Sequence, residues 1–440
     1  MKRSTPQDTT DKLGFFSSLA YPDYCLLWGA TACGQAAAWA LVVLRAALIY
    51  ELTGSNAWVG FVTLAAQLPS LVVTPFAGFL ADRFDRRRVL TCTFTLNLLN
   101  NLVLAVLVMS AYITPFTLLG IATMNGILRA TEIPTTQALL PNLVPPHYLL
   151  NAVALQQLMQ QGSRMIGPLL LLPIIHFIGP KPAFLMCAVF YAIGWSFVVL
   201  IRTASHGVVG QQGIMTNLVV GIRYIYTHPL LLSFMLITVL HCALTMAYEA
   251  AFPFVSRTQL GLTAAKDLFA GPTYLMIGVG AGAVVGNLAL ARVSSERIRG
   301  RLFLWLGLAS GLSPMVLSLM TTIPTAMVAV AAVGASTAAF MTLSHGAIQT
   351  LAPDGIRGRV VSAQTWHTQG TMAGFNGING MLMDMPWMTA PLLLGGTGLI
   401  FVLIVLGSIL TVHLRSVYTH GVPTVAMARA TALGNRPAIP

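Results

Sequence analysis

The sequence predicts an all-α membrane protein with twelve transmembrane helices. Of its 440 residues, 56% are hydrophobic and only 8% are charged, whereas charged residues make up about 25% of ordinary soluble domains. The mean hydropathy is +0.77. A soluble enzyme of this length needs a charged surface that this chain cannot supply, so that class is excluded. The hydrophobic residues suffice for roughly twelve spans of about 20 residues each.

Twelve apolar stretches have the length of a membrane-spanning helix. Helices are expected because lipid cannot satisfy the backbone groups at the edge of an open sheet. The ten-residue alternation of a membrane β-barrel is absent from the sequence. The expected spans are 24–51, 57–80, 89–111, 115–137, 151–175, 180–201, 230–254, 267–291, 301–320, 324–346, 358–383 and 388–412.

Lys and Arg are distributed unevenly between the loops. If the N-terminus is cytoplasmic, eighteen of the 24 fall in cytoplasmic segments, three in outer segments and three inside spans. Cytoplasmic loops of membrane proteins are enriched in these residues. The net charge of +12 therefore indicates topology rather than nucleic-acid binding. We expect a multi-pass protein of the plasma (inner) membrane with both termini cytoplasmic.

The spans form two groups of six, separated by a longer internal segment. After a Gly- and Gln-rich stretch, the residues from Met215 to Tyr226 have one apolar and one polar face, as in an interfacial helix. We therefore expect an N-terminal segment, a six-helix bundle, a linker with an interfacial helix, a second six-helix bundle and a cytoplasmic tail. Their ranges are 1–23, 24–201, 202–229, 230–412 and 413–440.

Both halves carry a glycine and a basic loop after their second helix, which indicates the internal repeat found in transporters. The first copy reads Gly78-Phe-Leu-Ala-Asp82-Arg83-Phe-Asp85-Arg86-Arg87-Arg88, and the second begins at Gly286 and lacks the aspartate. The first copy resembles the loop signature of the major facilitator superfamily. Segments similar to its bacterial efflux and siderophore-export (enterobactin-exporter-like) branch lie at 50–55, 77–88, 140–144, 150–155, 166–168 and 353–360.

That resemblance implies two pseudo-symmetric six-helix bundles around a central cavity, with rocking alternating access. It also implies a conformational latch at the first basic loop, formed by Gly78, Asp82, Arg83 and Arg86 together with the acidic Glu132 on the fourth helix. An anion at the end of a helix can favour the positive N-terminus of a neighbouring helix. The alternative is a plain solvated basic loop that sets the topology.

Arg45 and Glu249 are opposite charges inside equivalent helices, the first and the seventh, at similar distances from the outer ends. Charges inside spans are expensive and mark candidate functional sites. We expect the two to pair and to couple protonation to opening, with Glu132 as a second candidate for proton coupling or gating. A static pair that holds the halves together, or a charge near the outer surface, is the alternative.

Arg129 and Arg164 add two more cations inside spans, so the cavity is expected to be net positive and to suit an anionic or catecholate-like substrate. Gln156 and Gln160 share one helix face with Arg164, and Gln35 lies on the first helix. We expect these five residues to bind substrate. Alternatively, Arg129 pairs with Glu132 at i, i+3, Arg164 caps carbonyls, and the glutamines bond neighbouring helices.

The function expected from these features is secondary active export of a small amphipathic molecule, siderophore- or drug-like, by proton-coupled antiport. A lipid or lysophospholipid flippase on the same fold is the alternative. Motifs for zinc, nucleotide or nucleophilic catalysis are absent from the sequence, so we expect no enzyme, cofactor or metal. The expected partners are the substrate, protons and membrane lipid, with no nucleic acid, and we expect the monomer to be functional.

Overall fold

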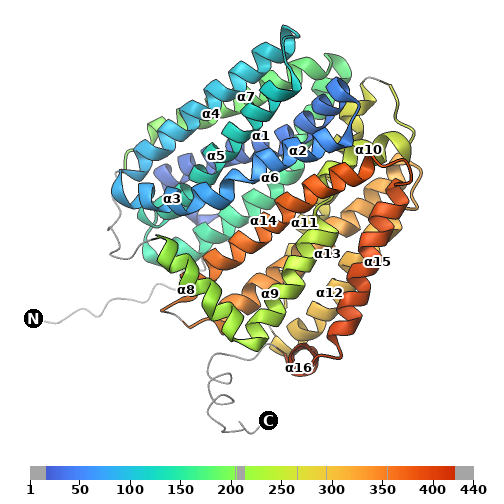
Figure 1. Ribbon diagram of the computed structural model, residues 1–440. Helices are drawn as coiled ribbons and strands as arrows, with labels where there is room; N and C mark the ends of the chain where they lie inside the picture. The colour runs from blue at the N-terminus through green and yellow to red at the C-terminus, as the bar shows by residue number, and fades with distance from the viewer. Residues whose placement is uncertain are drawn as a thin grey trace, which may run out of the picture.

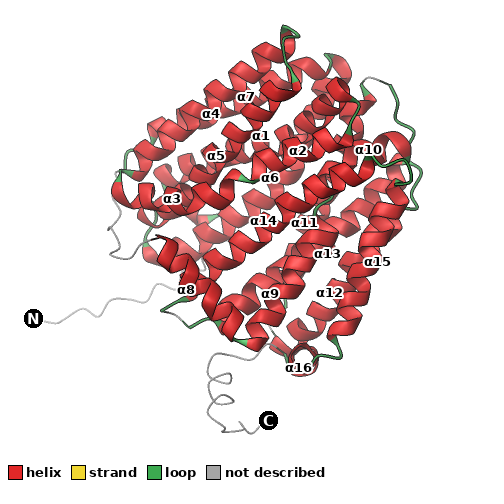
Figure 2. Cartoon of the chain, in the orientation of Figure 1, coloured by secondary structure: helices red, strands yellow, loops and turns green. Residues whose placement is uncertain are grey.

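The computed structural model describes residues 16–203, 205, 214–264, 266–293, 295–353 and 355–421. Every regular element within these ranges is a helix, as Figure 2 shows. The long helices run side by side, and the chain crosses from one end of the bundle to the other at each of them (Figure 1). The predicted all-α class is therefore confirmed for the described chain.

The two ends of the bundle differ in the short helices that lie there. Helix α8 (Ile214–Thr227) lies at the same end of the bundle as α3 (Pro69–Arg83) and α16 (Val412–His420), and we call this end of the bundle the linker end (Figure 1). The opposite end, where α10 (Phe252–Thr258) lies, is the distal end.

The N-terminal half contains six membrane-length helical units. After a short 3-10 turn, η1 (Ser17–Ala20), the second unit consists of two helices, α2 and α3, in line with each other. The elements are α1 (Pro22–Thr53), α2 (Asn56–Gln67), α3, α4 (Arg86–Met109), α5 (Pro115–Leu139), the turns η2 (Leu140–Asn142) and η3 (Pro146–Tyr148), α6 (Leu149–Phe177) and α7 (Pro180–Leu200).

The C-terminal half follows the linker helix α8 and repeats this plan. Its first unit is again interrupted. The elements are α9 (Pro229–His241), the π-helical turn η4 (Cys242–Met246), the 3-10 turn η5 (Glu249–Ala251), α10, α11 (Asp267–Ala291), α12 (Glu296–Leu317), α13 (Ile323–Leu351), α14 (Arg357–Met383), α15 (Ala390–Ser408) and the short α16.

Nine helical units of the described chain are long and apolar enough to cross a membrane. The other three membrane-length helices, α5, α6 and α14, have 25, 29 and 27 residues but are more polar. Together they account for the twelve predicted spans. The three polar helices carry most of the charged and amide side chains that the sequence marks as cavity candidates.

Local sequence explains where the helices end. Gly54 terminates α1 in the left-handed conformation, with φ of 66°, which glycine adopts without strain. Thr114 and Thr117 form a reciprocal capping box at the start of α5. Pro69 has no backbone N–H to donate, which fits the division of the second span into α2 and α3.

Glycines allow close contact between helices in the C-terminal half. A methyl group added at Gly278, Gly282 or Gly286 of α11 would collide with the backbone or side chains of α13. The four-residue glycine spacing of this span therefore serves close helix packing.

The apolar core is continuous across the two halves only toward the distal end. One cluster of buried residues joins the N-terminal half to the distal part of the C-terminal half, including Phe252, Val279 and Leu394. A second cluster lies at the linker end of the C-terminal half, around Phe303 and Phe340. Within the described residues, the halves are thus packed together at the distal end, and the core of the C-terminal half is separate at the linker end.

Candidate functional site

The seventh span is not a regular helix where it approaches the centre of the bundle. It changes from α-helix to a π-helical turn after His241, leaves helical geometry at Ala247 (ψ of 46°) and continues as the 3-10 turn Glu249–Ala251. We call residues 242–251 the broken segment. Turns of π-helix occur frequently at functional sites, and this one places Tyr248 and Glu249 at the junction of the two halves.

Two asparagines of α14 satisfy backbone groups that the break leaves without helical partners. Asn379 Nδ2 donates to the carbonyl of Ala247 at 2.7 Å, and the N–H of Ala250 donates to Asn376 Oδ1 at 3.3 Å. Buried backbone groups inside a membrane protein need such partners. These asparagines therefore hold the broken segment in place.

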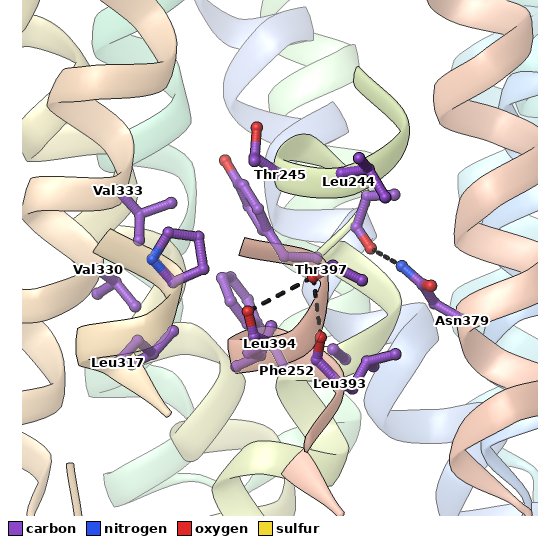
Figure 3. Close-up of a pocket in the computed structure, with 14 residues that line it drawn as sticks. Leu244, Thr245, Phe252, Leu317, Val330, Val333, Asn379, Leu393, Leu394 and Thr397 are labelled. Carbon is purple, nitrogen blue, oxygen red and sulfur yellow. Dashed lines mark hydrogen bonds between the residues drawn. The ribbon is translucent and has the colours of Figure 1, made fainter. Parts of the chain in front are cut away.

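A small cavity lies beside the broken segment. Its volume is about 10 Å³, which is about the room that one water molecule needs. Figure 3 shows Asn379 on one side of it and Leu317, Val330 and Val333 on the other. The cavity is too small for a substrate.

Glu249 is bound by two residues of the opposite half. Gln67 Nε2, at the end of α2, donates to Glu249 Oε2 at 2.9 Å. Arg164 Nη2, on α6, lies 3.5 Å from Glu249 Oε1 and donates to the hydroxyl of Tyr248 at 3.2 Å. Glu249 and Arg164 are 3% and 7% exposed. We call Gln67, Arg164, Tyr248 and Glu249 the junction cluster, because its polar contacts join the two halves.

The junction cluster has spare hydrogen-bonding capacity. Arg164 Nε and Gln67 Oε1 are buried without a hydrogen-bond partner. A buried polar atom in that state costs free energy, and a bound molecule could satisfy it. The junction cluster thus has a donor and an acceptor available to a ligand.

Trp39 of α1 lies against two guanidinium groups. The Cζ atom of Arg164 is 4.4 Å from the centre of the Trp39 ring, and that of Arg129 is 5.3 Å from it. Arg129 also donates to Gln35 Oε1 at 3.2 Å. An aromatic face attracts a cation without neutralising it. Two positive charges therefore gather beside Trp39, with Glu249 against Arg164 and Glu132 attracting Arg129.

A second polar network is confined to the N-terminal half. Arg45 Nη1 donates to Asn125 Oδ1 at 3.1 Å, Asn125 Nδ2 donates to Asn97 Oδ1 at 3.0 Å, and Asn97 Nδ2 lies 3.5 Å from Glu132 Oε2. Arg45 and Glu132 are 4% and 2% exposed. We call Arg45, Asn97, Asn125 and Glu132 the internal network. It connects a buried cation to a buried carboxylate through two amides.

The expected direct pairing of Arg45 with Glu249 is therefore incorrect, although the two charges still attract each other at longer range. Arg45 bonds within its own half, and the cation beside Glu249 is Arg164. The prediction counts residues from the outer ends of the first and seventh spans and assumes that both are regular helices, which places Arg45 and Glu249 at similar depths. The π-helical and 3-10 turns of the seventh span change both the rise and the rotation per residue, so the count no longer places Glu249 opposite Arg45.

The glutamines differ in their surroundings. Gln35 is buried and accepts the bond from Arg129, whereas Gln156 is buried with neither amide atom hydrogen-bonded, and Gln160 is half-buried. An unsatisfied buried amide is unusual in a native structure and points to a partner from outside the chain. The role of these glutamines in substrate binding stays a prediction.

The residues expected to form the latch are only partly described. The structure describes Gly78 and Asp82 only as part of helix α3, without the surroundings of their atoms, and Arg83 is exposed. Arg86 donates to the carbonyl of Ala138 at 2.9 Å and to the hydroxyl of Ser205 at 3.2 Å. These bonds connect the loop before α4 to the end of α5 and to the segment that follows α7.

Three residues of the site were not predicted from the sequence. Trp39 and Tyr248 are aromatic residues in apolar spans, and nothing in the sequence distinguishes them from lipid-facing or core aromatics. Gln67 did carry a signal, because it is a polar residue inside a span just before Pro69, where the helix divides.

The fold and the buried polar junction between two six-helix halves define a membrane transporter of the major facilitator type. Solved structures of such transporters have the same fold. They include the nucleoside transporter NupG (TM-score 0.69, 10% identity, 88% of this chain and 99% of that one). Another is a peptide transporter, POT, in complex with alafosfalin (TM-score 0.68, 13% identity, 93% and 97%).

The family follows from the sequence match. The family model described as transmembrane secretion effector matches residues 14–424, and the chain belongs to this family. A curated relative is the staphyloferrin A transporter of Staphylococcus aureus (strain NCTC 8325 / PS 47), 32% identical over 137 residues. That match covers 31% of this chain and 34% of the relative. The family and the structural neighbours are transporters, not enzymes.

Proposed function

We propose that the protein exports a small amphipathic molecule, siderophore-like in chemistry, in exchange for protons. The observation that carries the proposal is the junction cluster. There, the buried carboxylate of Glu249 meets Arg164 between the halves that must separate during alternating access, and Arg129 lies against the same Trp39 ring as Arg164. The similarity to the staphyloferrin A transporter supports a siderophore-like substrate.

The substrate class follows from the chemistry of the cluster. Arg164 and Arg129 offer charged donors to an acidic group, with Arg164 Nε free to bond. Glu249 offers an acceptor to a hydroxyl. A molecule with an acidic group and neighbouring hydroxyls, such as a catechol carboxylate or a hydroxycarboxylate, satisfies both.

Exchange requires that the substrate and the proton exclude each other. A hydroxyl of the substrate needs the ionised form of Glu249 as its acceptor, so a proton on that carboxylate weakens substrate binding. Protonation also weakens the attraction between Glu249 and Arg164, which lets the halves separate. A proton bound from one side and a substrate bound from the other are then carried in opposite directions.

The ion pair between Arg164 and Glu249 favours a second mode, in which substrate and proton are transported in the same direction. If a substrate anion displaces Glu249 from Arg164, the freed carboxylate binds a proton more readily, and substrate and proton move together. The two modes predict opposite pH dependence. Exchange predicts weaker substrate binding in acid, and co-transport predicts stronger binding in acid.

The direction of export depends on orientation. We propose that the linker end is cytoplasmic, in the plasma membrane, because Lys and Arg gather in the loops at that end. Cysteines at Arg88 and Arg297, both exposed at the linker end, should react with a membrane-impermeant reagent only from the cytoplasm. A cysteine at Thr258, at the distal end, should react only from outside. The opposite pattern would reverse the proposed direction.

The test of function is transport by the purified protein in proteoliposomes. An imposed pH gradient should drive a compound such as 2,3-dihydroxybenzoate in the direction opposite to proton flow. The panel should include hydroxycarboxylates, cationic drugs and lysophospholipids. Transport of lysophospholipid alone would favour the flippase alternative, and transport that is insensitive to the gradient would contradict proton exchange. We propose that the monomer suffices, because one chain supplies both halves.

A further inference from the structure

Asp384 connects the two halves at the distal end. It follows the last residue of α14 in the C-terminal half, and its carboxylate accepts hydrogen bonds from the first residues of α2 in the N-terminal half. Oδ1 accepts from the Asn56 N–H at 2.7 Å and from Asn56 Nδ2 at 3.1 Å. Oδ2 accepts from the Ala57 N–H at 3.0 Å and from the Ser55 hydroxyl at 2.5 Å.

This carboxylate replaces the cap that α2 would normally supply for itself. Ser55 occupies the N-cap position, but its side chain makes no capping bond to α2. The first N–H groups of a helix need acceptors, and the positive end of the helix dipole favours an anion. The N-terminus of α2 is therefore satisfied by the opposite half of the molecule.

The helices behind Asp384 are in close contact. A methyl group added at Gly380 would lie 2.6 Å from the carbonyl oxygen of Asn56 and 2.7 Å from the Cα of Gly60. A methyl group added at Gly60 would lie 2.9 Å from the carbonyl oxygen of Asn376. The contact between α2 and α14 thus depends on glycines and cannot persist if the halves separate here.

The same two helices hold Glu249. Gln67 at the end of α2 bonds its carboxylate, and Asn376 and Asn379 of α14 bond the broken segment that carries it. Movement of α2 away from α14 would therefore disturb the junction cluster and the Asp384 bonds together.

We propose that Asp384 is a distal latch, which holds the distal end of the transporter closed by capping α2 across the interface and must be released for that end to open. The proposal does not depend on the identity of the substrate or on proton exchange. It requires only that the transporter alternates between two conformations.

The ionisation of Asp384 agrees with this role. Burial raises the pKa of the Asp384 carboxyl, but the bonds from Ser55, Ala57 and Asn56 outweigh it, so the pKa lies below its ordinary value of 3.8. The carboxylate is thus stabilised in the charged form that caps a helix.

The test measures distances across the distal end by spin-label spectroscopy in nanodiscs. Labels at Tyr112 and Leu319, exposed on opposite halves, report the distal end, and labels at Phe84 and Leu410 report the linker end. Asp384→Asn should shift the ratio of closed to open distal distances toward open by about tenfold, because it removes the charge and half of the acceptors. The linker-end pair should move in the opposite sense.

Glu51→Gln is the matched control, since Glu51 is an exposed acid near the distal end of α1. It should leave both distance distributions unchanged. If Asp384→Asn folds and gives the wild-type distribution, or if Glu51→Gln causes the same shift, the latch is refuted.

A cross-link keeps the proposal testable if Asp384→Asn does not fold. Cysteines in place of Leu64 of α2 and Gly377 of α14, whose Cβ atoms would lie 3.9 Å apart, should form a disulfide that holds the distal end closed while Asp384 stays in place. Transport should fall at least tenfold under oxidising conditions and recover on reduction. Full transport with the cross-link formed would overturn the proposal, because the contact would then not need to break.

Discussion

The junction cluster and the internal network each bury one carboxylate and one guanidinium, yet they are arranged differently. In the junction cluster the partners come from opposite halves, and Glu249 lies on a segment that is not α-helical. In the internal network Arg45 and Glu132 lie on regular helices of one half, joined by Asn125 and Asn97. Contacts between the halves must break when the transporter changes conformation, whereas contacts within a half need not.

Buried charges in one chain can thus have different tasks. A buried ion pair contributes little net stability compared with apolar packing, but loss of one partner leaves a costly unpaired charge. We therefore expect changes in the junction cluster to alter transport, and changes in the internal network to alter stability. The predictions below separate these outcomes, from the largest expected effect on transport to the smallest.

Glu249→Gln should have the largest effect on transport. The amide cannot be protonated, so transport driven by a pH gradient should fall to the background of empty liposomes. Exchange of labelled for unlabelled substrate, which needs no net proton movement, should persist within about threefold of the wild-type rate at saturating substrate, although its KM should rise because the amide oxygen is a weaker acceptor than the ionised carboxylate. Both are measured in proteoliposomes. Gradient-driven transport at the wild-type rate would mean that Glu249 is not the coupling residue, and Glu132 would become the next candidate.

Arg164→Lys should weaken substrate binding by about tenfold, equivalent to about 1.4 kcal/mol. Lysine keeps the charge but loses the planar fork and the contact with Trp39. Arg129→Lys is the matched comparison and should have a smaller effect, since Arg129 lies farther from the Trp39 ring. The measurement is the KM for transport with kcat followed separately. Equal effects of the two substitutions would argue against a special position for Arg164.

Gly380→Ala tests the difference between contacts that join the two halves and contacts within one half, here at a glycine where two helix backbones meet. Gly380 contacts α2 of the opposite half, so an added methyl group should favour the distal-open state by severalfold in the spin-label measurement. Gly167→Ala, where the methyl group would meet Ala36 within the N-terminal half, should lower thermal stability instead. Gly377→Ala is the control, because its methyl group would make ordinary contacts of 3.5 Å with Leu64. A shift of the same size in Gly377→Ala would contradict the explanation that a steric clash between α14 and α2 causes the shift.

Glu132→Gln should have the smallest effect on coupling. It should leave the pH dependence of transport unchanged while it lowers the free energy of unfolding by on the order of 3 kcal/mol, because Arg129 loses the buried carboxylate that attracts it. The double substitution Glu132→Gln with Arg129→Met should recover part of that loss. Thermal unfolding in detergent measures both. A change in pH dependence without loss of stability would move the coupling role into the internal network.

The sequence predicted the fold more completely than the site. The twelve spans follow from hydrophobic length, and the two halves follow from the repeated glycine and basic loop. Arg164 and Glu249 stood out because charges inside spans are rare. Their contact could not be predicted, since it depends on the π-helical turn at Cys242–Met246, and no single residue in that stretch indicates a break. Asp384 resembled any loop aspartate, because its partners are 327 to 329 residues away in the chain.

Substrate affinity as a function of pH tests the central claim most directly, that substrate and proton compete at Glu249. Binding of the transported compound should be measured in detergent without a gradient, for the wild type and for Glu249→Gln. We predict that wild-type affinity falls as the pH is lowered through the titration of Glu249, and that the affinity of Glu249→Gln is flat over the same range. A wild-type affinity that rises in acid, or an unchanged pH dependence in Glu249→Gln, would contradict the account.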